Sequence, residues 1–196
     1  HTVLCYVNST VTIKALSDIC CTSSNALTIV NTLPAGEGII FVPDRHLGSY
    51  VQEQSGREMI LWKGFYPTHA RITPAMVEDA KRRHPGACVM MHPEAPAESR
   101  ARADVILSTG GMCAHARSAG EREFIVATET GLVHTLTRRN PEKTFYPLDE
   151  RITCPNMKLG SVESIVGVLE GRTGEEITVD ESIARRARGA LEKMLA

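Results

Sequence analysis

The segment from Cys88 to Met112, CVMMHPEAPAESRARADVILSTGGM, decides the expected fold. It reads as a short apolar run, a polar turn, a helix-length stretch, a second apolar run and a Ser-Thr-Gly-Gly turn. Short buried runs that alternate with helix-length segments are typical of parallel strands in an α/β layer. Ligands bind just beyond the carboxyl ends of such strands, so we expect both polar turns to face one site.

The same plan occurs once earlier in the sequence. Residues Val3–Asn25 align with Val89–Gly111, and the segment YVN (Tyr6–Asn8) then pairs with HPE (His92–Glu94). Hydrogen-bonding side chains therefore recur at matching places. This recurrence predicts two half-sites that face each other across a domain interface, where pockets commonly form.

A further match, shifted by one residue, pairs Ile39–Val51 with Phe124–Leu136. A repeat of this length exceeds solenoid periods and predicts two duplicated small α/β domains. We expect one domain at residues 1–72 and a second at 73–150. Residues 151–196 would hold a cysteine-containing loop and C-terminal helices that pack on a preceding domain outside this sequence.

Apolar and turn residues also predict the individual elements. The expected strands are Val3–Val7, Ile19–Cys21, Ile39–Val42, Met59–Trp62, Cys88–Met91, Asp104–Leu107, Phe124–Ala127 and Thr144–Tyr146. The expected helices are Thr10–Leu16, Ala26–Leu33, His46–Gln54, Pro74–Arg83, Pro96–Ala103, Gly111–Ala119, Gly131–Arg139, Ser161–Leu169 and Glu181–Leu195. Ser23 or Ser24 is expected to cap the helix that begins at Ala26.

Composition narrows the class of protein. The chain has 196 residues, of which 42% are hydrophobic and 23% charged, and its net charge is -1. The balanced charge and the lack of a basic cluster argue against nucleic acid as the main partner. No apolar run approaches the roughly 18 residues of a membrane span. We recognise no signal peptide and expect a reducing cytoplasmic setting.

Two residues of the second repeat are candidates for proton transfer. His92 and Glu94 lie two positions apart on one turn, so their side chains can point to the same side. A histidine and a carboxylate together can act as acid and base near neutral pH. The alternative is a surface turn with a satisfied histidine. The equivalent Tyr6 and Asn8 favour the functional interpretation.

The cysteines fall into three groups. Four lie inside expected strands and resemble small core residues: Cys5, Cys20, Cys21 and Cys88. Cys113 lies in the first turn of an expected helix and is ambiguous. Cys154 lies in a loop before Pro155, a frequent setting for iron–sulfur ligands, although one cysteine cannot hold a cluster. An overlay of the turn that begins at Tyr66 on the turn that begins at Cys154 places these two residues at equivalent positions.

Taken together, the motifs resemble the quinolinate synthase family in order and spacing over essentially the whole chain. They are YVN (Tyr6–Asn8), TSSNA (Thr22–Ala26), PDRHLGSYV (Pro43–Val51), KGFYPTH (Lys63–His69), HPE (His92–Glu94), STGGM (Ser108–Met112), TETGLVH (Thr128–His134) and CPNMK (Cys154–Lys158). The resemblance implies a cytoplasmic transferase of NAD biosynthesis that condenses iminoaspartate with dihydroxyacetone phosphate to give quinolinate. It also implies three similar αβα domains around a pseudo-threefold axis, so this chain should contain tandem duplicated three-layer αβα domains with short parallel sheets.

The resemblance implies roles for particular residues. Tyr6, Asn8, Ser23, His69, His92, Glu94 and Thr109 fall on substrate-binding positions, and proton transfer is expected from Glu94, His92 and Tyr6. A [4Fe-4S] cluster with one cysteine from each domain is implied, and Cys154 falls on one ligand position.

The sequence departs from the family pattern in two ways. Tyr66 stands where the family has a second cluster cysteine, so one of the three expected cysteines is present. The first domain is absent from this sequence, so we read the chain as a C-terminal portion that is inactive alone and self-associates through an uncovered apolar interface. The alternative is a non-catalytic relative without a cluster that binds dicarboxylates or sugar phosphates.

Overall fold

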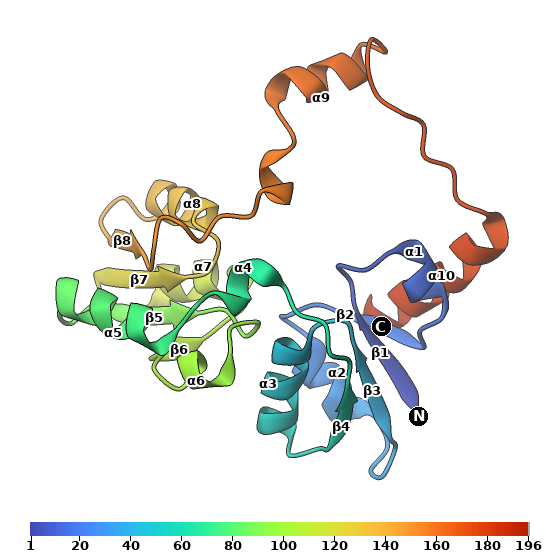
Figure 1. Ribbon diagram of the computed structural model, residues 1–196, viewed down its shortest axis with the longest axis horizontal. Helices are drawn as coiled ribbons and strands as arrows, with labels where there is room; N and C mark the ends of the chain where they lie inside the picture. The colour runs from blue at the N-terminus through green and yellow to red at the C-terminus, as the bar shows by residue number, and fades with distance from the viewer. Residues whose placement is uncertain (196) are drawn as a thin grey trace.

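The computed structural model describes residues 1–195 and contains two α/β units that lie side by side (Figure 1). Each unit is built on a four-stranded sheet in which the described strands all pair in parallel. This arrangement confirms the tandem αβα class predicted from the sequence. No helix in the described part of the chain is long and apolar enough to cross a membrane.

The first sheet has the order β2-β1-β3-β4. Its strands are β1 (Thr2–Tyr6), β2 (Ile19–Cys21), β3 (Ile39–Val42) and β4 (Met59–Leu61). The helices α1 (Val11–Ala15), α2 (Ala26–Thr32) and α3 (Arg45–Ser55) connect them. Because all the strands are parallel, their carboxyl ends lie at one edge of the sheet, where Tyr6 ends β1.

The second sheet repeats this order as β6-β5-β7-β8. Its strands are β5 (Cys88–Met91), β6 (Val105–Ile106), β7 (Glu123–Ala127) and β8 (Thr144–Pro147). Its helices are α5 (Pro74–Arg83), α6 (Ala97–Arg100), α7 (Thr109–Ser118) and α8 (Gly131–Arg139), and the short α4 (Pro67–Ala70) links the two units.

The internal repeat extends to single hydrogen bonds. The backbone N–H of Val3 donates to Asp18 Oδ2 at 2.8 Å, and that of Val89 donates to Asp104 Oδ2 at 2.8 Å. These are the pairs that the sequence alignment equates. The two units therefore share the register of their first strand pair as well as their strand order.

Alternate residues of each central strand pack on opposite faces of the sheet, as the twofold period of a strand requires. In β5, Val89 and Met91 contact the α5 side, whereas Met90 contacts Met112 of α7 and Leu136 of α8. The first unit uses the same plan, with Leu4 facing α2 and α3. Both units therefore have three layers.

The C-terminal helix α10 (Glu181–Leu195) covers the remaining face of the first sheet (Figure 1). Ala190 packs on the buried Cys5 and Cys20, and Lys193 Nζ donates to the carbonyl of Asp18 at 3.1 Å. We expected this helix to pack on a preceding domain outside this sequence. In the described residues it packs on α1 and β2 of the first unit, where its small residues Ala187 and Ala190 are buried.

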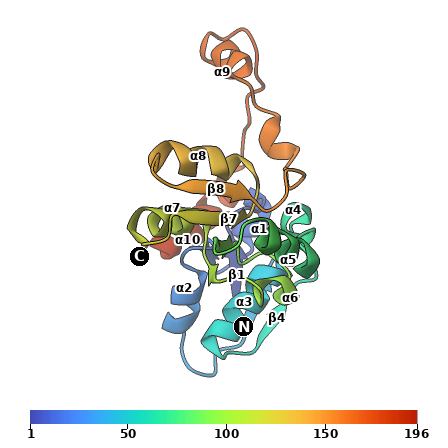
Figure 2. The same ribbon diagram turned by 90° about the vertical axis from the view of Figure 1, so that its left-hand side faces the viewer.

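The 3₁₀ turn η1 (Asn156–Lys158) follows the second sheet and lies beside the start of α8. The segment between η1 and α10, which contains the helix α9 (Val162–Leu169), stands away from both sheets in both views (Figures 1 and 2). Ser161 and Ser164 form a capping box at the start of α9, which satisfies its first free amides. The apolar side chains of α9 are exposed, among them Val162 at 73% and Leu169 at 82%.

One capping prediction is wrong. Neither Ser23 nor Ser24 caps α2, whose N-cap residue is Asn25 without a side-chain cap. The Asn25 side chain turns back and accepts from the Thr22 backbone N–H at 2.6 Å and from the Thr22 hydroxyl at 2.9 Å. This local turn leaves Ser24 free to contact the second unit, where its hydroxyl lies 2.8 Å from Ser108 Oγ.

Candidate active site

A cavity of about 930 Å³ lies between the two units. All nine residues singled out from the sequence line it: Tyr6, Asn8, Ser23, Tyr66, His69, His92, Glu94, Thr109 and Cys154. They come from the carboxyl ends of strands in both sheets and from the turns at α4 and η1. The two half-sites expected from the repeat therefore meet in one cavity.

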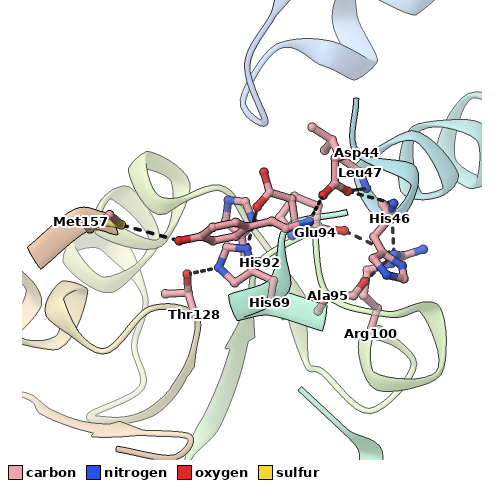
Figure 3. Close-up of polar contacts among 12 residues, drawn as sticks. Asp44, His46, Leu47, His69, His92, Glu94, Ala95, Arg100, Thr128 and Met157 are labelled. Carbon is pink, nitrogen blue, oxygen red and sulfur yellow. Dashed lines mark hydrogen bonds and ion pairs between the residues drawn. The ribbon is translucent and has the colours of Figure 1, made fainter. Parts of the chain in front are cut away.

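His69 is a buried residue that lines this cavity. The helix α4 begins with Pro67 at its first position, which fixes the turn that carries the histidine. His69 Nδ1 lies 2.6 Å from Glu94 Oε2, and its Nε2 lies 2.8 Å from Thr128 Oγ1 (Figure 3). Both ring nitrogens are engaged, so the ring is held in one orientation.

His92 stacks on His69 with ring centroids 4.5 Å apart. Burial and the neighbouring His69 lower the pKa of His92 to about 3, although the Glu94 carboxylate acts in the opposite direction. The backbone N–H of Glu94 donates to His92 Nδ1 at 3.3 Å, which requires that nitrogen to be unprotonated. His92 is therefore a neutral imidazole whose proton is on Nε2.

Glu94 is 3% exposed and remains ionised. Burial alone would raise the pKa of its carboxyl group, but the hydrogen bond from His69 and the nearby imidazoles lower it below the usual range. Glu94 Oε1 is buried and has no hydrogen-bond partner among residues 1–195. An ionised oxygen without a partner can accept a hydrogen bond or a proton from a bound ligand.

Tyr6 faces the same carboxylate from the first unit. Burial and the negative charge of Glu94 raise the pKa of the Tyr6 phenol far above its ordinary value, and the Ser23 hydroxyl opposes this shift. The phenol therefore stays protonated and can act as a hydrogen-bond donor to a ligand.

The cavity wall beside Thr109 suits an anion. Ser108 caps α7 by accepting from the Gly111 backbone N–H at 3.1 Å, and Thr109 is the first residue of that helix. The free amides and the positive end of the helix dipole favour negatively charged groups. Ser23 lies across the cavity in the first unit.

Sequence reasoning missed three buried residues of the cavity, namely Asp44, Thr128 and Glu129. Asp44 Oδ2 accepts from the backbone N–H of Tyr66 at 2.8 Å, while its Oδ1 caps α3. Thr128 and Glu129 follow β7 directly. The polar residues after β3 and β7, in PDRH and TETG, could have indicated them by the same rule that selected the HPE turn.

Glu129 orders the segment that carries Cys154. Its Oε1 accepts from the Cys154 backbone N–H at 3.4 Å and lies 3.2 Å from Lys158 Nζ. Its Oε2 accepts from the backbone N–H of Gly131 at 2.8 Å. The loop from 154 to 158 is thereby attached to the start of α8.

Tyr66 and Cys154 lie next to each other in the wall of the cavity. The Tyr66 hydroxyl contacts Met157 Sδ at 3.9 Å, and the nearby phenol lowers the pKa of the Cys154 thiol. Burial and the proximity of Cys154 raise the pKa of Tyr66 to about 12. The phenol is therefore the protonated partner of this pair.

These features define a class of protein: a duplicated α/β chain with an ionised glutamate, two imidazoles and a phenol in a cavity suited to a small anionic ligand. The family model described as Quinolinate synthetase A protein matches residues 1–196. The chain belongs to this family.

Individual relatives agree with that assignment. The chain is similar to quinolinate synthases of Dehalococcoides mccartyi (strain CBDB1) and Methanosarcina barkeri (strain Fusaro / DSM 804), each 43% identical. It is also 44% identical to that of Geotalea uraniireducens (strain Rf4). The alignments cover 98%, 99% and 99% of this chain and 63% of each relative. The chain thus spans less than two thirds of the length of these curated relatives.

The residues described do not fit a [4Fe-4S] cluster held by three cysteines. One cysteine, Cys154, lines the cavity, and Tyr66 presents a phenol beside it. Cys5, Cys20 and Cys21 are buried, and Cys113 lines a separate groove. A phenol cannot replace a soft thiolate without changing the ligand chemistry of the site.

Proposed function

We propose that this chain supplies acid–base and anion-binding residues to a quinolinate synthase that condenses iminoaspartate with dihydroxyacetone phosphate in NAD biosynthesis. The reaction yields quinolinate, one phosphate and two waters. The observation that carries the proposal is the buried His69–Glu94 pair at 2.6 Å, which stands in a cavity lined by both repeats.

The charge of the substrates matches the cavity. Iminoaspartate carries two carboxylates and the second substrate a phosphate, and Thr109, Ser23, Asn8 and Tyr6 offer hydrogen-bond donors around the cavity. The start of α7 adds a positive dipole end beside Thr109. These residues would bind and orient the anions so that the reacting carbon atoms meet.

Loss of water and closure of the ring both require protons to move. Glu94 is ionised and its Oε1 has no partner in the described chain, so it can take a proton from a substrate carbon or nitrogen. His69 stabilises the carboxylate through its hydrogen bond and is a positioning residue. The neutral His92 can donate from Nε2, and the protonated Tyr6 can stabilise developing negative charge.

Cys154 is the one cysteine of the described residues that lines the cavity, and a single cysteine cannot hold a [4Fe-4S] cluster. We infer one of two situations. Either a cluster in the whole protein takes its other ligands from residues outside this chain, or the protein has lost the cluster because Tyr66 stands in place of a cysteine ligand. This substitution supports the second candidate function, a non-catalytic relative that binds dicarboxylates or sugar phosphates.

The deciding experiment uses the full-length protein from the gene that encodes this chain. Iron and acid-labile sulfide per chain, together with quinolinate formation, are measured after anaerobic reconstitution for the natural protein and for Tyr66→Cys. About four iron and four sulfide atoms with activity in both forms would support the enzyme. A cluster and activity in Tyr66→Cys alone would favour the binding relative. Absence of quinolinate formation in both reconstituted forms would refute the proposed enzyme.

A further inference from the structure

A second group of metal-ligating side chains lies outside the candidate active site. Cys88, His115 and Glu121 each offer one ligand atom, and these atoms all lie within 4.8 Å of one another. The three residues come from the start of β5, from α7 and from the loop before β7. They are thus close in space although they are up to 33 positions apart in the sequence.

The group lies at the opposite end of the sheet from the candidate active site. Cys88 is the first residue of β5, whereas His92 and Glu94 follow its last residue. At about 3.3 Å per residue, the four-residue strand separates Cys88 from His92 by roughly 13 Å. The group therefore does not belong to the cavity described above.

His115 has a second feature that suits a metal ligand. Its Nε2 is buried and has no hydrogen-bond partner among residues 1–195. A buried imidazole nitrogen without a partner loses its bonds to water, which costs free energy. The ring packs on Phe124 with centroids 6.1 Å apart, so the ring orientation is restricted. A metal ion bound through Nε2 would satisfy this nitrogen.

From this geometry we propose that Cys88, His115 and Glu121 bind a Zn²⁺ ion, with water as the fourth ligand. A thiolate, an imidazole and a carboxylate form a donor set that zinc accepts in tetrahedral geometry. Their charges, one negative from the thiolate and one from the carboxylate, balance the ion.

The three ligand atoms must move slightly closer together to bind zinc, because they lie within 4.8 Å of one another. Bonds of about 2.0–2.3 Å to a tetrahedral zinc place ligand atoms about 3.3–3.8 Å apart. Glu121 is exposed on a loop, so its side chain can move inward by the remaining distance. The charges around Cys88 also favour a cation, because Glu121 and Asp104 face it, while Lys81 is paired with Asp104 at 3.1 Å.

The test uses the tag-free chain, freed of metal and kept reduced, with Co²⁺ as a spectroscopic probe for zinc. Bound Co²⁺ with a thiolate ligand gives a charge-transfer band that carboxylate and imidazole ligands do not produce. We expect this band in the natural chain, its loss in Cys88→Ser and its displacement by Zn²⁺. Cys154→Ser is the matched control, since it removes a thiol at the other end of the sheet, and it should retain the band.

If Cys88→Ser or Cys154→Ser unfolds the chain, Glu121→Gln still tests the proposed zinc site. This exposed change should weaken Co²⁺ binding by at least about tenfold, since even indirect partners of a metal site contribute 10–100-fold. The proposal is overturned if the natural chain gives no thiolate band, if the band survives Cys88→Ser, or if it disappears in Cys154→Ser alone. Unchanged affinity in Glu121→Gln would remove that residue from the site and overturn the three-ligand proposal.

Discussion

Asp44 and Glu129 occupy equivalent places in the two units, and each accepts a hydrogen bond from the backbone N–H of the residue that begins the cavity-lining turn. The backbone N–H of Tyr66 donates to Asp44 Oδ2 at 2.8 Å, and the backbone N–H of Cys154 donates to Glu129 Oε1 at 3.4 Å. The two turns that the sequence overlay equates are thus attached to their sheets by the same device. The side chains differ between the repeats, but the means of placing them is shared.

Asp44→Asn tests this attachment. Asparagine can still cap α3, but its amide NH₂ group would face the Tyr66 backbone N–H, so two donors would meet. We expect the free energy of unfolding to fall by about 1–3 kcal/mol, which urea denaturation measures. Asp79→Asn removes an exposed carboxylate and should change stability by less than about 0.5 kcal/mol. Equal effects of the two substitutions would contradict the role of Asp44.

Acid should weaken the fold through His92. In the folded state the pKa of His92 is about 3, below the ordinary 6.5. As the pH falls, His92 therefore binds a proton in the unfolded chain before it does so in the folded chain. This contribution is complete above about pH 6.5 and is lost toward pH 3, with a slope of at most about 1.4 kcal/mol per pH unit. His92→Gln should flatten the slope of unfolding free energy between about pH 6.5 and 4.5. An unchanged slope would mean that His92 titrates normally.

Glu94→Gln should abolish most of the activity proposed for the full-length protein. Loss of a general base reduces the rate by about 10²–10⁴-fold, and the effect should appear in kcat rather than KM. Glu142→Gln removes the same charge from an exposed residue and should leave the rate unchanged. Full activity in Glu94→Gln at the same iron content would exclude the proton-transfer role.

Tyr66 should control the reactivity of Cys154. The phenol lowers the pKa of this thiol, so Tyr66→Phe should raise it and slow alkylation at about pH 8, where less thiolate would be present. The rate for the Cys154 peptide is measured by mass spectrometry after timed iodoacetamide treatment. Tyr146→Phe serves as the control, because the Tyr146 ring stacks on His84 and is not among the residues that line the cavity. A rate that Tyr66→Phe leaves unaltered would show that the two groups do not interact.

The exposed apolar side chains of α9 should make the isolated chain self-associate. Val162, Ile165 and Leu169 lie on one stripe of this helix and are 73%, 59% and 82% exposed. Sedimentation at increasing concentration should show a rising average mass, and Ile165→Glu with Leu169→Glu should reduce it. Glu163→Gln on the same helix is the control. A natural chain that stays monomeric throughout would contradict this expectation.

Much of the fold could be predicted from the sequence, because it follows from local sequence patterns that occur twice. Six elements have the predicted bounds, for example β5 over Cys88–Met91 and α10 over Glu181–Leu195. The parallel order followed from apolar runs that alternate with helices. The ends of the short helices were less predictable: α6 covers Ala97–Arg100 instead of Pro96–Ala103, since a helix of one turn is fixed by its packing more than by its sequence.

Part of the site could also be predicted, because its residues follow strands at matching places in the two repeats. Tyr6, His92 and Glu94 follow strands, and the rule for open α/β sheets placed them together. The sequence could not show that His69 reaches Glu94 at 2.6 Å, because this contact depends on how the linking turn enters the second unit. It also could not show that α10 covers the first sheet, since an amphipathic pattern reveals that a face is buried but not what buries it.

The position of α10 on the first sheet affects the order of folding during synthesis. The strands and helices of the second unit are complete once β8 has left the ribosome, so that unit can fold while the chain is still being made. The first unit is synthesised earlier, but its buried Cys5 and Cys20 are covered only after α10 has been made. We therefore expect the second unit to complete its fold before the first unit does.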